Sequence, residues 1–537
     1  MQYSLAEIFD AVAQAVLDRE ALITENERIT YNELLCHSKR LARFFIKNSL
    51  GNVIERKNLK PWQSGQDHIA LYLYNTKEYV EGMFGAYFAR CAPYNVNYRY
   101  VEAELEYLFG DTSPKAVIYD AVFEQLLESV RDKAKALKLF IRTGQSSTNS
   151  PAINYNEIIN DSSLDEIDLP KPSFEDLYIL CTGGTTGLPK ATLWHQYDIY
   201  YAALGGIEGL NLEMISQAAK NSSPVKVLVA PPLMHGAAQW VTLRTLFTGG
   251  TVILYKGDKG LVASDLLKLI EIEKPLILLI VGDAFARPLA DEIERGDYDL
   301  SSLKIIVTGG AITSETQKNR LLKLIPGLSI VDVGGASETG SQLISVSNSG
   351  QTNTVFEPEP TTLIVDESQQ RILDKSDFSL GWLVKVGHVP LGYLNDENKT
   401  KATFKEIEGK KMAIPGDRAR YLPDGKIELL GRDSVTINSG GEKIFAEEVE
   451  AAIGRHPAIA DVVVTRRPSE KWGSEVVAIV KIKQGMQASD EDLIKCAAEV
   501  LARYKLPKEI IRVSTIVRSP AGKADYRWAK EIAKTKG

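Results

Sequence analysis

The sequence has 537 residues, a length that predicts about three to four structural units rather than one compact domain. Hydrophobic residues make up 44% of the chain and charged residues 25%, so large buried cores are available and a fibrous or disordered chain is excluded. The formal net charge of −7 argues against a nucleic-acid-binding protein, which normally carries a basic domain or stripe.

The cysteines and the N-terminus indicate the cellular compartment. Cys36, Cys91, Cys181 and Cys496 lack the spacing of a disulfide framework or a zinc site, which is typical of a reduced intracellular chain. The first residues lack the basic and apolar regions of a signal peptide. The longest apolar run, Pro275–Val281, is far shorter than the roughly 20 residues that span a bilayer. The sequence therefore predicts a cytoplasmic protein without a transmembrane segment.

Short aliphatic runs alternate with amphipathic segments over most of the chain. Such alternation predicts an α/β architecture with mostly parallel strands. In chain order, the predicted elements are the strand His68–Tyr74, the helix Tyr79–Ala89, the strands Ala116–Tyr119, Val225–Val229 and Thr251–Tyr255, the helix Ala263–Glu273, and the strands Ile277–Val281 and Lys304–Thr308.

The pattern changes near Arg432. Tyr421–Leu429 predicts a hairpin, because Pro-Asp-Gly at its centre is a turn sequence. After a glycine-rich loop, the chain predicts a helix from Ala446, strands over Ile459–Thr465 and Val476–Ile482, a helix over Asp490–Arg503 and a basic end. These elements make a compact α+β unit of about 100 residues, and the domain boundary is placed at Arg432–Val435.

The strongest chemical signal is a loop directly after the apolar strand Asp176–Leu180. The loop reads Thr182-Gly183-Gly184-Thr185-Thr186-Gly187-Leu188-Pro189-Lys190. Its backbone amides and hydroxyls can wrap a polyphosphate, and Lys190 adds a positive charge. It is not the common nucleotide P-loop, because two residues separate Gly187 from Lys190. The alternative interpretation is a plain linker loop.

The loop resembles the phosphate-binding signature of the adenylate-forming superfamily, which contains acyl-CoA synthetases, peptide-synthetase adenylation domains and luciferases. One departure is Ala191, where glycine is usual. The resemblance covers the chain from about residue 5 to 530 and implies an α/β fold. The implied fold comprises a large N-terminal adenylation domain of mixed sheets flanked by helices (residues 1–431) and a small mobile α+β C-terminal domain (residues 432–537). It also implies ATP, Mg²⁺ and coenzyme A as cofactor and co-substrates.

Other motifs follow in the order of that family. The segment that contains His235 resembles the one between the acyl pocket and the phosphates, and it implies an acyl pocket of His235, Gly236, Gln239 and Trp240. Thr308-Gly309-Gly310-Ala311 resembles the turn against adenine. Gly334-Gly335-Ala336-Ser337-Glu338 resembles the motif whose hydroxyl contacts the α-phosphate and whose Glu, here Glu338, holds magnesium together with Thr185. Gly334 replaces the aromatic residue that usually stacks on adenine.

The second half of the resemblance concerns the ribose, the hinge and coenzyme A. It implies that Asp417 accepts hydrogen bonds from the ribose hydroxyls and that Arg432 contacts the nucleotide. The hinge is expected at Arg432, Asp433 and Ser434, and the coenzyme A loop at Ser439, Gly440, Gly441 and Lys443.

The C-terminal lysine, Lys523, follows Pro520-Ala521-Gly522. It resembles the residue that stabilises charge while the substrate carboxylate attacks the α-phosphate. With Glu338 and His235 it completes the implied catalytic set. A basic C-terminus that is merely solvated is the alternative interpretation.

The implied reaction is ATP-dependent activation of a carboxylic acid through acyl-AMP, followed by transfer to coenzyme A. Segments 93–100, 283–287 and 387–393 resemble bacterial ligases of fatty acids or steroid side-chain acids. The expected partners are therefore small molecules, with no nucleic acid. The sequence leaves open whether the chain forms a homodimer. Two rivals remain: an enzyme that loads another acceptor, such as a carrier protein or an amino-acid substrate, and a non-catalytic nucleotide-binding protein.

Overall fold

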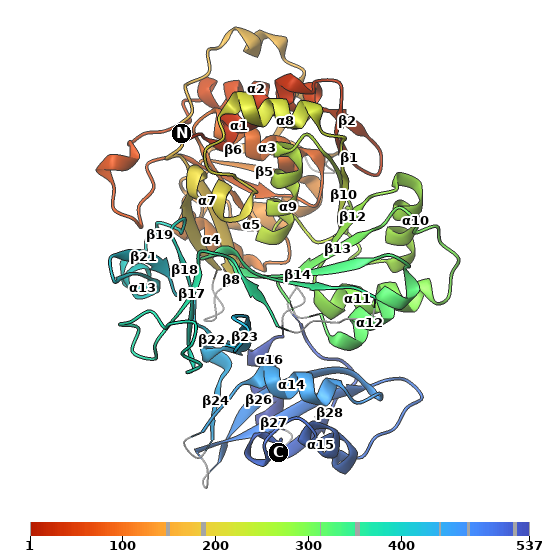
Figure 1. Ribbon diagram of the computed structural model, residues 1–537. Helices are drawn as coiled ribbons and strands as arrows, with labels where there is room; N and C mark the ends of the chain where they lie inside the picture. Colours follow the sequence, from red (N-terminus) through yellow and green to blue (C-terminus); the bar gives the residue numbers. More distant parts are fainter. Residues whose placement is uncertain are drawn as a thin grey trace.

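The computed structural model describes residues 2–145, 151–183, 189–311, 313–349, 355–439, 442–469, 473–518 and 524–535. Figure 1 shows a large N-terminal part above a smaller C-terminal part, which is drawn in blue. Among the described residues, no helix has the length and apolar character needed to cross a membrane.

One sheet of the N-terminal part is fully parallel. Its central strands, residues 68–72 and 116–120, are almost fully buried, as expected for a parallel sheet that is covered on both faces. In spatial order the strands of this sheet are β4 (Ala92–Asn95), β3 (His68–Tyr72), β5 (Ala116–Asp120), β6 (Leu139–Thr143) and β7 (Ile153–Asn154). The helices that follow them are α3 (Lys77–Phe88), α4 (Glu102–Thr112), α5 (Glu124–Val130) and α6 (Tyr155–Ile159).

A nine-stranded sheet forms the second layer. Its central strands are parallel, whereas β2, β15 and β16 at its two ends pair antiparallel. The spatial order is β16 (Glu357–Pro358), β15 (Gly340–Ser347), β14 (Ser329–Ala336), β13 (Ile305–Gly309), β12 (Ile277–Ile280), β10 (Lys226–Val229), β11 (Thr251–Leu254), β1 (Glu20–Ile23) and β2 (Arg28–Thr30).

Helices pack on both faces of this sheet. One continuous core joins it to the first sheet through α1 (Leu5–Ala15), α2 (Tyr31–Lys47), α8 (Leu212–Asn221), α9 (Gly236–Phe247) and α3. The other face is covered by α10 (Ala263–Glu273), α11 (Gly282–Ile293) and α12 (Glu315–Leu324) (Figure 1).

Two smaller sheets are antiparallel, so the mostly parallel arrangement expected from the strand–helix alternation holds only for the two large sheets. The first contains β8 (Leu177–Gly183), β9 (Pro189–His195) and β19 (Gly392–Tyr393), with α7 (Gln196–Ala203) and α13 (Glu397–Thr403) nearby. The second contains β20 (Phe404–Ile407), β21 (Lys410–Ala413), β18 (Gly381–Val386), β22 (Asp417–Tyr421) and β23 (Ile427–Arg432), with β17 (Thr362–Val365) paired to β18.

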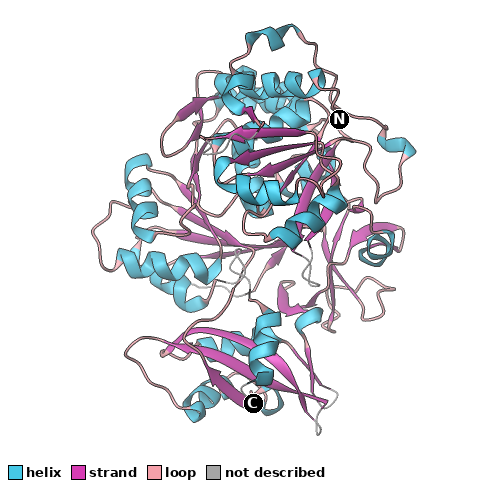
Figure 2. Cartoon of the chain, turned by 180° about the vertical axis from the view of Figure 1, so that it is seen from behind, coloured by secondary structure: helices cyan, strands magenta, loops and turns pink. Residues whose placement is uncertain are grey.

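The C-terminal part has cores of its own, built only from residues 435–533. Helices pack against its sheet, as Figure 2 shows from behind. Its elements are β24 (Ile437–Ser439), β25 (Glu442–Ile444), α14 (Ala446–Gly454), β26 (Ile459–Ser469), β27 (Gly473–Ile482), α15 (Asp490–Ala498), β28 (Glu509–Arg512) and α16 (Tyr526–Thr535).

One expectation for this part is corrected, and one element is added to those expected. The helix expected over Asp490–Arg503 ends at Ala498, and Arg503–Lys505 form a separate 3₁₀ turn. The basic end of the chain contains a helix, α16, because Ala529 and Ala533, four residues apart, are buried on one side of it.

Candidate functional site

The predicted phosphate loop connects the two strands of a buried hairpin. Thr182 on β8 pairs with Lys190 on β9, and Gly183 pairs with Pro189. The loop positions Gly184, Thr185, Thr186 and Gly187 lie outside the described residues. The hairpin therefore fixes the two ends of the loop, including Lys190, relative to the rest of the site.

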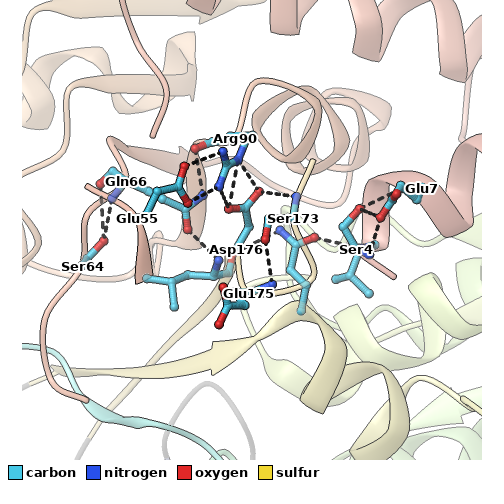
Figure 3. Close-up of polar contacts among 12 residues, drawn as sticks. Ser4, Glu7, Glu55, Ser64, Gln66, Arg90, Ser173, Glu175 and Asp176 are labelled. Carbon is cyan, nitrogen blue, oxygen red and sulfur yellow. Dashed lines mark hydrogen bonds and ion pairs between the residues drawn. The ribbon is translucent and has the colours of Figure 1, made fainter. Parts of the chain in front are cut away.

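An ion-pair network holds the base of this hairpin (Figure 3). The Arg90 guanidinium lies 2.9 Å from the Asp176 carboxylate and 2.9 Å from Glu55. Asp176, which precedes β8, is 3% exposed, and its backbone carbonyl accepts a hydrogen bond from the amide of Gln196, which directly follows β9 (2.8 Å). Burial raises the pKa of the Asp176 carboxyl, and the hydrogen bonds from Arg90 oppose that rise. Both strands are thus tied together at Asp176.

Several predicted segments lie at the carboxyl ends of neighbouring parallel strands. His235 follows β10, the turn 309–311 begins at the last residue of β13, and residues 334–338 span the end of β14. Since β14, β13, β12 and β10 are consecutive in the sheet, these segments reach the same edge. In open α/β sheets, ligands bind at that edge.

The turn between β14 and β15 contacts the hairpin. The Trp194 indole N–H donates a hydrogen bond to the Ser337 carbonyl (2.9 Å), and the Ser337 and Thr182 hydroxyls are 3.5 Å apart. Glycine is needed at two positions of the turn. A Cβ on Gly335 would lie 2.1 Å from the Gly340 carbonyl oxygen, and Gly340 has a φ of +66°.

The predicted adenine turn, Gly309, Gly310 and Ala311, runs beside β14. A Cβ on Gly309 would lie 2.8 Å from the Val333 carbonyl oxygen, and Gly310 has a φ of +78°. Gly334 pairs with Leu343 across β14 and β15, and a Cβ at residue 334 would lie 3.1 Å from the Leu343 side chain. A larger residue at 334 would therefore require Leu343 to shift.

Glu338 is held by a residue from another strand. The Tyr393 hydroxyl on β19 donates a hydrogen bond to Glu338 Oε1 (2.7 Å). The Lys190 ammonium lies 3.4 Å from Asp396 Oδ2, which follows β19. Lys399 on α13 lies over the Tyr393 ring, with its Nζ 4.6 Å from the ring centroid. Partial burial and the nearby Lys190 ammonium lower the pKa of Lys399 to about 8.

Asp396 and Lys399 were not among the predicted site residues. They lie more than 200 residues after Lys190 in the chain, so no local pattern connects them with the loop. The available signal was the segment 387–393, which resembles the family and leads directly into them.

Two buried asparagines hold the segment before His235. Asn75 donates to the Pro231 carbonyl (2.9 Å) and accepts from the Leu233 amide (2.6 Å). Asn95, at the end of β4, donates to the carbonyls of Met234 and Cys181, 2.6 Å in each case. Buried amides of this kind need complete hydrogen bonding, which here fixes the backbone path into His235.

The residues predicted for the acyl pocket lie at the start of α9. His235 precedes the helix, and a Cβ on Gly236 would lie 2.7 Å from Leu180 and 3.2 Å from the Trp240 ring. His235, Gly236 and Trp240 are partly exposed. Gln239, by contrast, is 2% exposed and bonded to Tyr178, Tyr79 and Leu233, so it lies in the core behind this surface.

Asp417 and Arg432 meet at one end of a hairpin, where β22 pairs with β23. Asp433 begins a 3₁₀ turn over Asp433–Val435 that contains Ser434, and its amide donates to the Gly416 carbonyl (3.0 Å). The expected ribose-binding carboxylate therefore lies directly beside the expected hinge.

The C-terminal residues of the predicted site are described in part. Ser439 pairs with Glu442, and Asn438 pairs with Lys443 in the β24–β25 hairpin. Gly440, Gly441 and Lys523 lie outside the described residues. The ends of the segment that carries Lys523 are joined by a bridge between Arg518 and Ala524, and Arg518 is bonded to Asp461 (2.6 Å).

Comparison with known proteins identifies the family. A family model described as AMP-binding enzyme matches residues 9–378, and the model of its C-terminal domain matches residues 448–523. The chain therefore belongs to the family of AMP-binding enzymes.

Full-length relatives extend the match. The chain is 44% identical to the medium-chain acyl-CoA ligase Mig of Mycobacterium avium, over 99% of this chain and 98% of that protein. It is 36% identical to a 3-oxocholest-4-en-26-oate–CoA ligase of Rhodococcus rhodochrous, over 99% of this chain and 96% of that protein.

Solved structures share the fold and thereby confirm the predicted fold class. The anthranilate CoA ligase AuaEII in complex with anthranoyl-AMP has a TM-score of 0.84 at 19% identity and covers 99% of this chain and 98% of its own. ATP-bound MatB from Rhodopseudomonas palustris has a TM-score of 0.80 at 19% identity and covers 100% of both chains.

Proposed function

We propose that the chain is an ATP-dependent acyl-CoA ligase that activates a carboxylic acid through acyl-AMP and transfers it to coenzyme A. The observation that carries this proposal is the convergence of Lys190, Glu338 and Ser337 at the sheet edge that also receives His235 and residues 309–311. The full-length relatives named as acyl-CoA ligases support it.

In the first half-reaction, an oxygen of the substrate carboxylate attacks the α-phosphorus of ATP. The bond from that phosphorus to the bridging oxygen breaks, and pyrophosphate leaves with the electron pair. No protein nucleophile is required, because the substrate carboxylate is already charged. The chain contributes positioning and charge stabilisation through the 182–190 loop and Lys523.

The donor set fits magnesium. Glu338 offers a carboxylate and follows Ser337, whose hydroxyl lies 3.5 Å from that of Thr182, and hard cations prefer such oxygen ligands. Glu338 would hold the ion, with Thr185 as the second expected ligand. When bound, magnesium neutralises phosphate charge. The Tyr393 hydroxyl fixes the direction of the Glu338 carboxylate.

The nucleotide is proposed to lie between the turn 309–311 and the residue pair Asp417 and Arg432. The two oxygens of Asp417 match the two ribose hydroxyls. Because Gly334 offers no ring, adenine stacking at that position is absent and the turn backbone supplies one face of the site.

In the second half-reaction, the small domain (residues 432–537) rotates about Arg432, Asp433 and Ser434. This motion removes Lys523 and brings the loop of Ser439, Gly440, Gly441 and Lys443 to coenzyme A. The thiol loses its proton and its sulfur attacks the acyl carbon of the mixed anhydride. AMP leaves with the electron pair of the carbon–oxygen bond.

We infer that the substrate is a medium-chain fatty acid or a steroid side-chain acid. The names of the relatives support this substrate class, and the small side chain of Ala237 at the start of α9 suits a site for an apolar tail. Gly236 adds no room, because a Cβ there would already contact Leu180 and Trp240. The cytoplasmic location and a homodimer stay predictions.

The test is magnesium-dependent pyrophosphate release from ATP over medium-chain and long-chain fatty acids, steroid side-chain acids and amino acids, with and without coenzyme A. Release with an apolar acid, coupled to formation of a CoA thioester, is the expected result. Release without a thioester would indicate another acceptor, such as a carrier protein. No release with any of the acids would contradict the proposal and favour a nucleotide-binding protein.

A further inference from the structure

Two ammonium groups converge on one aromatic ring beside the phosphate loop. Lys190 Nζ lies 5.8 Å and Lys399 Nζ 4.6 Å from the centroid of Tyr393. Lys190 comes from β9, and Lys399 from the first turn of α13. The start of α13 is fixed, because the Asp396 carboxylate accepts a hydrogen bond from the Lys399 amide (2.9 Å).

The charges around these lysines are only partly balanced. Asp396 lies 3.4 Å from Lys190, and Glu338 is hydrogen-bonded to Tyr393. Among the residues that the structure describes, no carboxylate lies within ion-pair distance of Lys399. Burial lowers the pKa of Lys399 most, and the Lys190 ammonium lowers it further, because two like charges in a partly buried place repel each other. An anion bound between the two lysines would relieve this repulsion.

The position of the pair selects the anion. Lys190 ends the loop that is expected to surround the phosphates, and Glu338, the expected magnesium ligand, shares Tyr393 with Lys399. We propose that Lys399 is a second phosphate-binding residue, which acts together with Lys190 on the pyrophosphate part of ATP. The inference rests on the proposed function and adds a residue to it.

The proposal gives Lys399 a role in one half-reaction only. Negative charge develops on pyrophosphate as its bond to the α-phosphorus breaks, and two ammonium groups stabilise that charge better than one. Coenzyme A attack on acyl-AMP begins after pyrophosphate has left. Lys399 therefore has no part in the second half-reaction.

The experiment compares Lys399→Met with the intact chain in ATP–pyrophosphate exchange and in thioester formation from supplied acyl-AMP. A lost charged hydrogen bond predicts a rise of at least about tenfold in the KM for ATP and in the inhibition constant for pyrophosphate. Thioester formation from acyl-AMP should stay within about twofold. Lys399→Arg retains the charge and should restore most of the affinity for both ligands.

Lys401→Met is the matched control. Lys401 lies on the same helix as Lys399, and its side chain is 67% exposed and pairs with Glu397. The substitution Lys401→Met therefore removes a positive charge from that helix at a position outside the proposed site. Its KM for ATP should stay unchanged.

The pH dependence supplies a readout that a structural role would not change. For the intact enzyme, kcat/KM for ATP should fall as the pH rises through about 8, because Lys399 loses its proton. Lys399→Arg should move that fall to higher pH. The other titratable groups that face Lys399 are Lys190, Asp396, Glu338 and Tyr393.

Three outcomes would overturn the inference: a KM for ATP in Lys399→Met within twofold of the intact enzyme, equal losses in both half-reactions, or no rescue by Lys399→Arg. Each is distinct from failure of the proposed function, which would leave the intact chain without exchange for any acid.

Discussion

At the scale of single residues, a buried carboxyl group makes the stability of the C-terminal part depend on pH. Glu450 on α14 accepts hydrogen bonds from the Val464 amide (2.8 Å) and the Tyr526 hydroxyl (3.3 Å). Burial raises the pKa of Glu450 to about 8, with the neighbouring Glu447 adding to the rise. The folded state therefore keeps a proton that an unfolded glutamate, with a pKa of about 4.3, has lost.

The stability of this part should decline as the pH rises from about 4.3 to 8, since the folded state binds more protons than the unfolded state in that window. Glu450→Gln removes the proton and keeps an oxygen that can accept both hydrogen bonds. The variant should melt nearly equal to the parent at pH 4, increasingly above it as the pH rises, and clearly above it at pH 9, measured by scanning calorimetry. Glu491→Gln, on the exposed first turn of α15, is the control. Parallel pH profiles for Glu450→Gln and the parent would contradict the assignment.

At the scale of elements, we expect the hairpin that carries the predicted phosphate loop to depend on the ion pair between Asp176 and Arg90. Asp176 is 3% exposed and paired with Arg90, whose side chain is 16% exposed (Figure 3). Arg90→Met should lower the free energy of unfolding by about 3–5 kcal/mol, because a buried carboxylate is left without its partner. Urea unfolding measures the loss, and Asp176→Asn in the same background should recover part of it.

Arg131→Met is the comparison for Arg90. Arg131 pairs with Glu128 on the surface, where both side chains are more than 30% exposed. Its removal should change the free energy of unfolding by less than about 1 kcal/mol. Equal effects of the two substitutions would show that the hairpin base does not depend on the Arg90–Asp176 pair.

Much of the element pattern could be predicted from the sequence, because apolar runs determine which segments are buried. The helix Ala263–Glu273 is confirmed with its bounds, and the strands over 116–119 and 277–281 are confirmed to within one residue. The contact between Tyr393 and Glu338 could not be predicted, since it joins residues 55 positions apart through two different sheets. The buried roles of Asn75 and Asn95 depend in the same way on partners remote in the chain.

At the scale of the whole molecule, the two parts of the chain have separate cores and a narrow connection. Residues 435–533 form the C-terminal cores, and residues 432–435 connect them to β23. Gly431 has a φ of +122°, and a Cβ there would lie 2.3 Å from Glu447 Oε2 on α14, so a glycine is needed where the two parts touch. A short connection between two separate cores is a place where a hinge can turn.

Rotation predicts that Lys523 serves one half-reaction only. Lys523→Ala should reduce formation of acyl-AMP by about 100-fold or more, in line with the loss of a charge-stabilising donor. Thioester formation from supplied acyl-AMP should be largely retained. Single-turnover assays of each half-reaction measure the split, with Lys508→Ala, an exposed lysine of the same part, as the control. Equal loss in both half-reactions would remove Lys523 from its proposed role.

The two asparagines that hold the segment before His235 have a consequence for how substrate preference can change. Asn75 and Asn95 bind the backbone of residues 231–234 and lie outside that segment. The path of the main chain into α9 is therefore independent of the side chain at residue 237. Replacements of Ala237 are therefore expected to reshape the wall of the proposed acyl site without moving the main chain, so that substrate preference can change by single exchanges at this helix start.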